Sequence, residues 1–247
     1  MDKEKLDWIS RAYNFITSPK VIRICGYGAL LLFFGCIGTA IIVAATLGEY
    51  GYNIFHNWIS VLGNHIFTPA PFLLDTAVIS AGVLLVPLNF YMEKYLAPIP
   101  QTAEELPAPH RMVYRLMGLS FFWNLLGSLG LIGVGIFSED RDIAYLHFIF
   151  SVLLFGSFAF SAIFMGLRIT FIKQSIIPKP FNFITGLYGI CVPIPVAIIA
   201  GYHVFEETAY QWIMEWIIFL VLIGLIVPVF VFALRHAEKQ LKSEKER

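Results

Sequence analysis

The chain has 247 residues, of which 58% are hydrophobic and only 14% are charged. A soluble domain carries roughly 25% charged residues, so this deficit excludes an ordinary soluble domain and indicates that most of the surface faces lipid. The formal net charge is zero, so charge gives no bias toward nucleic acid, and no nucleic-acid partner is expected.

Residues 1–20 are expected to form an amphipathic helix on the membrane surface. Charged residues there alternate with apolar residues at helical spacing, namely Leu6, Ile9, Tyr13 and Ile16. That spacing places one apolar stripe on a helix. A helix with such a stripe and a charged opposite face is typical of an interfacial segment.

Six apolar runs follow, each long enough to cross the hydrocarbon core as a helix. They predict an all-α integral membrane protein with a six-helix transmembrane domain over residues 21–236 and a charged tail over residues 237–247. The third run is rich in glycine, which lets membrane helices approach closely. The fifth contains Pro193 and Pro195, which remove backbone donors and are expected to bend the helix. The expected spans are 24–48, 72–92, 116–137, 143–167, 181–202 and 216–234.

The distribution of basic residues predicts the orientation. All of the 17 lysines and arginines except Arg141 fall on the side that holds the N-terminal segment, the second and fourth connections and the tail. Because basic residues accumulate on the cytoplasmic side, both termini are expected in the cytoplasm, with the plasma membrane as the expected location. The three cysteines, Cys25, Cys36 and Cys191, lie inside apolar runs and are expected to act as small hydrophobic residues rather than as a disulfide framework.

The connection between the first two spans, from Glu49 to Pro71, is expected to fold over the outer end of the bundle. It alternates aromatic and apolar residues with hydrogen-bonding groups, a composition suited to the headgroup level. Asp75, His147 and His203 lie near the outer ends of three spans. Since an ionisable group in hydrocarbon costs a few kcal/mol, we expect these groups to converge beneath the segment from His56 to Ser60 and form a polar pocket.

Two catalytic uses of that pocket are open. A zinc site needs three or four ligands and an open position for water, which His56, His147 and His203, with Asp75, would supply. A nucleophilic site would use Ser60 with a histidine as base, His56 or His147, and Asp75 or Asp142 as the orienting acid. Neither an HExxH pair nor a GxSxG setting is present.

The third use is a pocket without catalysis, which binds a lipid headgroup or another amphiphile. Its ligand-binding residues would be the polar groups already named, with aromatic surface for acyl chains or rings. The full predicted set is Tyr52, His56, Trp58, Ser60, Asp75, His147 and His203.

Taken singly, each residue also has a purely structural explanation. Ser60 with Gly63 fits a turn or a helix cap, because a serine oxygen accepts from free backbone amides. His147 fits a packed interior histidine, and Tyr52 and Trp58 fit interfacial anchors. A protein that organises the membrane without any ligand therefore remains an alternative, and neither a cofactor nor an oligomeric state is indicated.

The run Asn57-Trp58-Ile59-Ser60-Val61-Leu62-Gly63, followed by Thr68-Pro69 and by Ala81-Gly82 in the second span, resembles an uncharacterised family of prokaryotic six-helix membrane proteins (a domain of unknown function). It is more distantly similar to the DRAM (damage-regulated autophagy modulator) group. A histidine at the outer start of a later span is shared, and here it is His147. DRAM-type sequences commonly carry an acidic residue after the serine, where this chain has Val61. The resemblance implies six spans and relatives connected with lipid handling or membrane organisation.

The function expected from the sequence is the binding or handling of a lipid-like molecule at the outer leaflet, with membrane lipids as partners. A membrane-embedded hydrolase or acyltransferase using the same residues, with or without zinc, is the alternative.

Overall fold

The computed structural model describes residues 3–97, 108–141, 143–172, 176–206, 208 and 210–246. Within these residues the chain is helical, with turns and short irregular connections and no strand. The prediction of an all-α fold is confirmed. Six helical segments are long and apolar enough to cross a membrane, which agrees with the predicted number.

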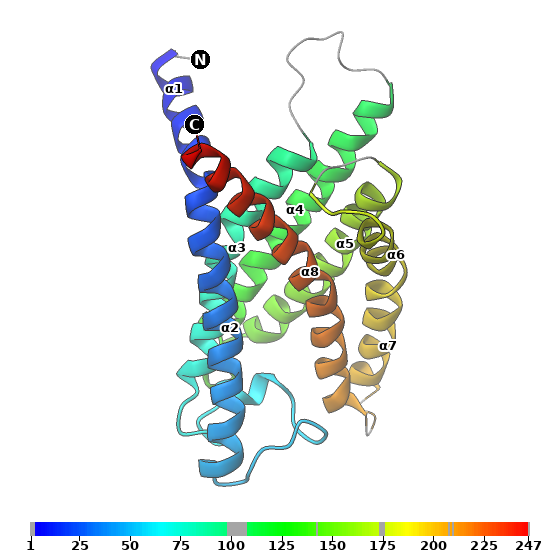
Figure 1. Ribbon diagram of the computed structural model, residues 1–247. Coiled ribbons are helices and arrows are strands. Elements are labelled where there is room, and N and C mark those ends of the chain that lie inside the picture. Colours follow the sequence, from blue (N-terminus) through cyan, green and yellow to red (C-terminus); the bar gives the residue numbers. More distant parts are fainter. Residues whose placement is uncertain are drawn as a thin grey trace.

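The helices follow one another along the chain and run mostly along the long axis of the molecule (Figure 1). The fifth span is divided, because α6 ends at Cys191 and Pro193, which has no backbone N–H, begins α7. The predicted bend at this position is therefore present as a break at Val192. The elements are α1 (Lys3–Ile16), α2 (Pro19–Leu47), η1 (Ser60–Gly63), α3 (Phe72–Leu96), α4 (Ala108–Ile136), η3 (Glu139–Arg141), α5 (Leu146–Phe171), α6 (Phe181–Cys191), α7 (Pro193–Phe205) and α8 (Gln211–Lys245).

Several helices extend beyond the predicted spans, and α2 and α8 do so toward the chain termini. α8 continues through most of the charged tail to Lys245, so the tail is a helical extension of the last span. α1 is separated from α2 only by Thr17 and Ser18, and Ser18 caps α2 by accepting a hydrogen bond from the N–H of Val21. Pro19 occupies the first turn of α2, where its missing N–H costs nothing. Whether α1 lies on a membrane surface stays a prediction.

Helices α3, α4 and α5 pack closely because glycines replace larger side chains where they touch. A Cβ at Gly82 would lie 2.7 Å from the carbonyl oxygen of Ser128, and one at Gly130 would lie 2.7 Å from the Cα of Leu154. Backbones this close leave no room for a side chain. The predicted role of the glycines in the third span therefore holds for Gly130, which sets the α4–α5 contact.

Helices α2 and α8 meet at one end of the bundle and separate toward the other (Figure 1). Near the chain termini a Cβ at Gly26 would clash with the side chain of Leu234. We call this the terminal end of the bundle. At the opposite end, here called the loop end, residues 48–71 with η1 fill the space between the two helices (Figure 1).

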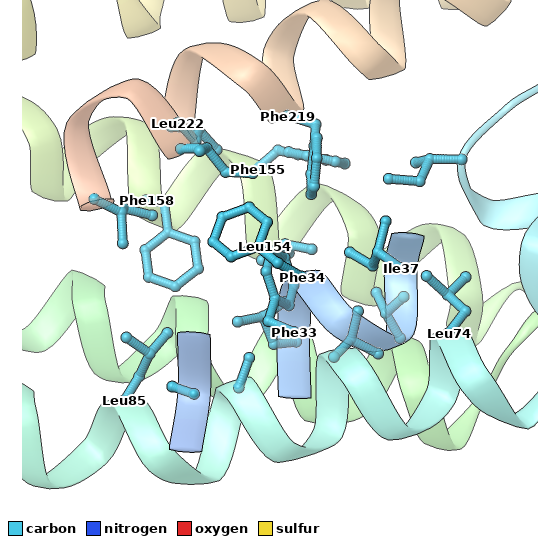
Figure 2. Close-up of a pocket in the computed structure, with 18 of the residues that line it drawn as sticks. Phe33, Phe34, Ile37, Leu74, Leu85, Leu154, Phe155, Phe158, Phe219 and Leu222 are labelled. Carbon is cyan, nitrogen blue, oxygen red and sulfur yellow. The ribbon is translucent and has the colours of Figure 1, made fainter. Parts of the chain in front are cut away.

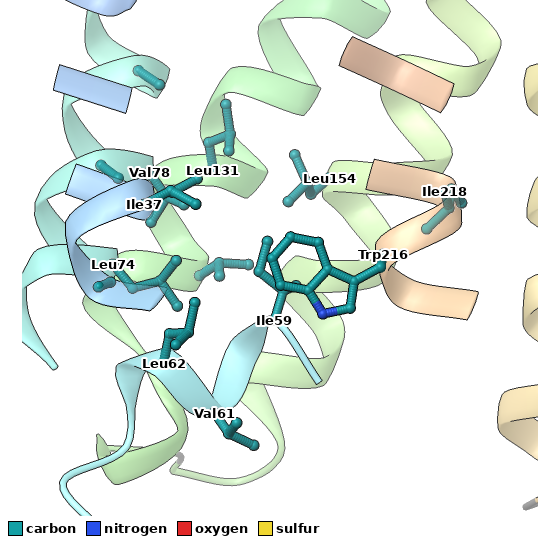
Figure 3. Close-up of a cluster of buried hydrophobic side chains, with 14 of the residues drawn as sticks. Ile37, Ile59, Val61, Leu62, Leu74, Val78, Leu131, Leu154, Trp216 and Ile218 are labelled. Carbon is teal, nitrogen blue, oxygen red and sulfur yellow. The ribbon is translucent and has the colours of Figure 1, made fainter. Parts of the chain in front are cut away.

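The loop is held at the loop end by apolar packing. Ile59 and Leu62, from the segment around η1, lie against Leu74 of α3 and Trp216 of α8 in one buried cluster (Figure 3). Leu62 is fully buried. The segment from 59 to 63 is therefore part of the core and not a solvated connection, and its apolar side chains anchor the cap that closes this end.

Candidate functional site

A cavity lies inside the bundle between α2 and α8. It holds about 1000 Å³ of atom-free space, counting its opening, and also borders α3, α4 and α5. Phe33, Phe155, Phe158, Phe219 and Leu222 stand around this space and give it an apolar wall (Figure 2). The lining residues of α2 and those of α8 lie on opposite sides of the cavity, in the region where the two helices are separated.

The cavity has polar side chains at one end only. Its four polar lining residues are Ser60 of η1, His147 and Ser151 of α5, and Glu215 of α8. Ser60 and His147 begin their helices, and Glu215 lies in the first two turns of α8. All four therefore belong to the loop end or its first turns, while the remainder of the wall is hydrocarbon. This distribution of polar and apolar lining residues corresponds to the polar head and the apolar tail of an amphiphile.

Glu215 fixes the position of η1. Its Oε2 accepts hydrogen bonds from the backbone N–H groups of Ile59, at 2.7 Å, and of Ser60, at 3.4 Å. The first N–H groups of a helix have no partner within it, and η1 lacks a side-chain cap, so a carboxylate from α8 fills that role. The neighbouring Trp216 donates from Nε1 to the carbonyl of Asn57 at 3.2 Å. Two successive residues of α8 thus clamp the loop.

Ser60 contacts a second carboxylate through its hydroxyl group. Ser60 Oγ donates to Glu139 Oε1 of η3 at 2.7 Å. Because the hydroxyl has a single proton, it is committed to this carboxylate. Ser60 therefore donates hydrogen bonds to two carboxylates. Its hydroxyl donates to Glu139, and its backbone N–H donates to Glu215.

Asp75 is paired with the one basic residue predicted at this end. Arg141 Nη2 contacts Asp75 Oδ2 in an ion pair, and also donates to Ser138 Oγ at 2.9 Å and to the carbonyl of Gly135 at 3.1 Å. The other oxygen of Asp75, Oδ1, is buried without a hydrogen-bond partner. The pair ties α3 to the α4–α5 connection, beside Gly63 of the loop, whose added Cβ would lie 3.6 Å from Oδ1.

The histidines have separate settings. His147 Nδ1 donates to the carbonyl of Phe137 at 2.8 Å, which joins the start of α5 to the end of α4. His203 Nδ1 bonds the hydroxyl of Thr208 at 2.7 Å, within its own turn. His65 bonds Asp140 at 2.8 Å, and His56 is exposed on the loop.

Tyr52 and Trp58 serve the loop rather than the cavity. Tyr52 is buried and donates from its hydroxyl to the carbonyl of Trp58 at 3.1 Å, and burial raises the pKa of this phenol. Trp58 is half-buried against the same core cluster as Ile59. Neither side chain lines the cavity.

Of the predicted site residues, the structure thus brings Ser60 and His147 to the same cavity. Asp75, His203 and His56 do not line it, so the expected convergence of Asp75, His147 and His203 on one pocket is not what the described chain shows. The physical reason is that Asp75 and His203 have other partners, Arg141 of η3 and Thr208, while His56 is exposed on the loop. Asp142, the alternative orienting acid, lies outside the described residues.

The two catalytic arrangements are not assembled in the described part of the chain. No hydrogen bond joins Ser60 to His147 there, and Asp75 is engaged by Arg141, so a Ser60–His–Asp75 relay does not form. Across the described residues, no three His, Cys, Asp or Glu side chains gather closely enough to hold a metal ion. In particular, His56, His147 and His203 have three different surroundings.

The sequence reasoning missed Glu139, Ser151 and Glu215. Glu215 carried a signal that was available, because an acid inside an apolar span commonly faces the bundle interior and has a specific partner. Glu139 lies in the run Glu139-Asp140-Arg141-Asp142, whose charge made a solvated turn the natural interpretation.

Comparisons with known proteins give no relative: no family model, no curated protein and no solved structure matches this chain.

Proposed function

We propose that this six-helix protein binds one lipid-like molecule in the cavity between α2 and α8, with the polar group of the ligand at the loop end. The observation that carries the proposal is a cavity with one polar end and an otherwise apolar wall, set inside a bundle of membrane-spanning length. Binding sites for small molecules are mostly apolar, with a few placed polar groups.

The wall between α2 and α8 offers a path from the lipid. Phe34 lines the cavity and is also 42% exposed on the outside of α2, so the cavity comes close to the lipid-facing surface at this residue. Phe33 of α2 and Phe219 of α8 face each other with ring centroids 5.9 Å apart. A molecule that moves in from the bilayer would pass between these helices without leaving hydrocarbon.

The distribution of basic residues supports an orientation with the loop end on the outer side. All lysines and arginines except Arg141 belong to the terminal end or its connections. By the positive-inside rule both termini are cytoplasmic, so the polar end of the cavity lies at the outer leaflet. The sequence resemblance implies relatives connected with lipid handling or membrane organisation, which is compatible with a lipid-like ligand.

The experiment is a binding measurement with a neutral probe, a radiolabelled long-chain alcohol, on protein purified in mild detergent. The test variant is Ile223→Trp, because Ile223 lines the cavity on α8 and a larger ring would fill it. The matched control is Leu220→Trp, since Leu220 is on the same helix but is 58% exposed and outside the lining.

We expect saturable binding to the wild-type protein and to Leu220→Trp, and a loss of about tenfold or more in affinity for Ile223→Trp, equivalent to about 1.4 kcal/mol or more. Native mass spectrometry on the same samples counts bound molecules. Equal binding by both variants, or no saturable binding by the wild type, would contradict the proposal and leave the ligand-free structural protein.

A further inference from the structure

We infer that the head group taken at the polar end of this cavity is a cationic amine, and that the ligand is an amphiphile with an ammonium head. The inference rests on the proposed function, because it names the class of molecule that the same cavity would bind. It is carried by the charges and hydrogen bonds around Ser60.

Two carboxylates converge on Ser60. Glu215 accepts from the backbone N–H of Ser60, and Glu139 accepts from its hydroxyl. Glu215 also lines the cavity, and Glu139 is half-buried beside it. Carboxylates held this close to hydrocarbon repel each other and need a positive partner to be stable as ions.

No basic side chain of the described residues supplies that partner. The ion pairs at this end are His65 with Asp140 and Arg141 with Asp75, and neither includes Glu139 or Glu215. Arg141 is the single lysine or arginine in the connections at the loop end, and its Nη2 is already shared among Asp75, Ser138 and Gly135. Within the described residues, neither Glu139 nor Glu215 is therefore paired with a lysine or arginine.

One acceptor remains open toward the cavity. Glu215 Oε2 takes both loop amides, while its Oε1 has no hydrogen-bond partner within the described residues. An ammonium donates up to three hydrogen bonds and has no acceptor, so it matches a free carboxylate oxygen with further oxygens near it. A phosphate or a fatty-acid carboxylate would instead bring a third negative charge to Glu139 and Glu215.

The apolar wall fixes the other half of the molecule. Beyond Glu215 the lining residues from α8 are all apolar. They are Phe219, Leu222, Ile223, Ile226, Val227 and Phe230. This surface suits a hydrocarbon chain. The ammonium could belong to a single-chain amine or to the ethanolamine head of a phospholipid, and the phosphate of the second molecule would have to remain outside, toward the wet side of the loop.

The test compares three probes with the same saturated chain and different heads: the primary amine, the alcohol and the carboxylic acid. Binding is measured at neutral pH on full-length protein in mild detergent. We expect the wild type to bind the amine about tenfold or more tightly than the alcohol, as for a charge-assisted hydrogen bond in a poorly hydrated site. The acid should bind more weakly than the alcohol.

The decisive variant is Glu215→Gln, which keeps an oxygen to accept from the amides of Ile59 and Ser60 but removes the charge. It should bring amine and alcohol to equal affinity within this variant, so the readout is the ratio of the two affinities rather than the affinity for either probe. Glu139→Gln is a second variant, with a smaller loss of the amine preference expected because Glu139 is farther from the lining. Glu206→Gln, at an exposed turn after α7, is the control and should change nothing.

The results separate the two proposals. If the alcohol binds in the cavity but the amine has no advantage, or if the fatty acid is preferred, the amine head is wrong and the cavity function stands. If no probe binds saturably, both are wrong. Phosphatidylethanolamine and phosphatidylglycerol nanodiscs form the last arm: displacement of the amine by the first lipid alone identifies a phospholipid source, and displacement by neither identifies a single-chain amine.

Discussion

The terminal end and the loop end solve the same packing problem in different ways. At the terminal end α2 and α8 touch through Gly26 and Leu234, and Tyr27 of α2 donates to Glu238 of α8 at 2.6 Å. At the loop end the two helices stand apart, and a cavity and a separate chain segment fill the gap. One end is closed by direct contact between helices, whereas the other is closed by a cap.

The two ends also differ in how their polar side chains are hydrogen-bonded. At the terminal end Tyr91 bonds His236 Nδ1 at 2.7 Å, and Tyr95 exchanges hydrogen bonds with Gln240, so hydrogen-bonding groups on α3 and α8 satisfy one another. At the loop end Glu215 keeps an open oxygen beside the cavity. The loop end also pairs most of its polar groups, and the difference on which the proposal depends is the Glu215 oxygen that remains open beside the cavity.

The largest expected effect is on the close-packed side of the bundle. Gly130→Leu would force α4 and α5 apart, because even a Cβ would lie 2.7 Å from the Cα and from the N of Leu154. Overpacking of this kind costs about 1–3 kcal/mol, occasionally more, and we expect the upper part of that range. Thermal unfolding in detergent measures it. Gly35→Leu is the control, since no atom lies within 4 Å of a Cβ at Gly35; equal losses in the two variants would refute the difference in packing.

The second effect concerns the cap. Glu215→Ala leaves the amides of Ile59 and Ser60 without their acceptor, and each buried amide left unpaired costs about 1–3 kcal/mol. We expect a loss of about 2 kcal/mol in stability and faster hydrogen exchange at residues 59–63, while Glu215→Gln retains most of both. Unchanged exchange in the alanine variant would show that apolar packing alone holds η1.

A smaller effect is expected at the ion pair between Asp75 and Arg141. The arginine side chain is 54% exposed and the aspartate side chain 14%, so solvent screens the pair and its contribution is about 1 kcal/mol. A double-mutant cycle with Asp75→Asn and Arg141→Met isolates the coupling. Coupling near zero would mean that the pair does not help to join α3 to the α4–α5 connection.

An effect as small as that of the ion pair is expected at the terminal end. Tyr91→Phe removes the hydrogen bond to His236 and keeps the ring, which costs about 1 kcal/mol of stability. Binding of the long-chain alcohol should remain at the wild-type value, because Tyr91 does not line the cavity between α2 and α8. A parallel loss of alcohol binding would show that the two ends are coupled rather than separate.

Sequence reasoning was strongest where a single physical demand decides the outcome. The cost of an exposed backbone in lipid requires helices, so the number of spans and the break at Pro193 followed from hydropathy and from the missing proline donor. The glycines of α4 likewise marked a close contact before its partner was known.

The candidate site was harder to predict, because the pairing of polar groups depends on distances in the folded chain. The spacing of residues in the sequence does not determine those distances. Asp75, His147 and His203 share one end of the bundle, yet each satisfies itself nearby, with Arg141, with the carbonyl of Phe137 and with Thr208. Glu215 was overlooked as a site residue because it was placed just before the expected span 216–234 and counted as an outer residue, whereas α8 begins at Gln211. Its partners are backbone amides more than 150 residues away, and no local pattern shows them.

The most direct measurement for the cavity is photolabelling with a neutral long-chain alcohol that carries a diazirine in mid-chain, followed by mapping of the labelled residues. We expect label on the inward residues Phe155, Leu222 and Ile226, with loss of that label in Ile223→Trp. Label confined to outward residues such as Leu31 and Leu220, which are exposed on α2 and α8, would contradict a lipid-binding cavity between these helices.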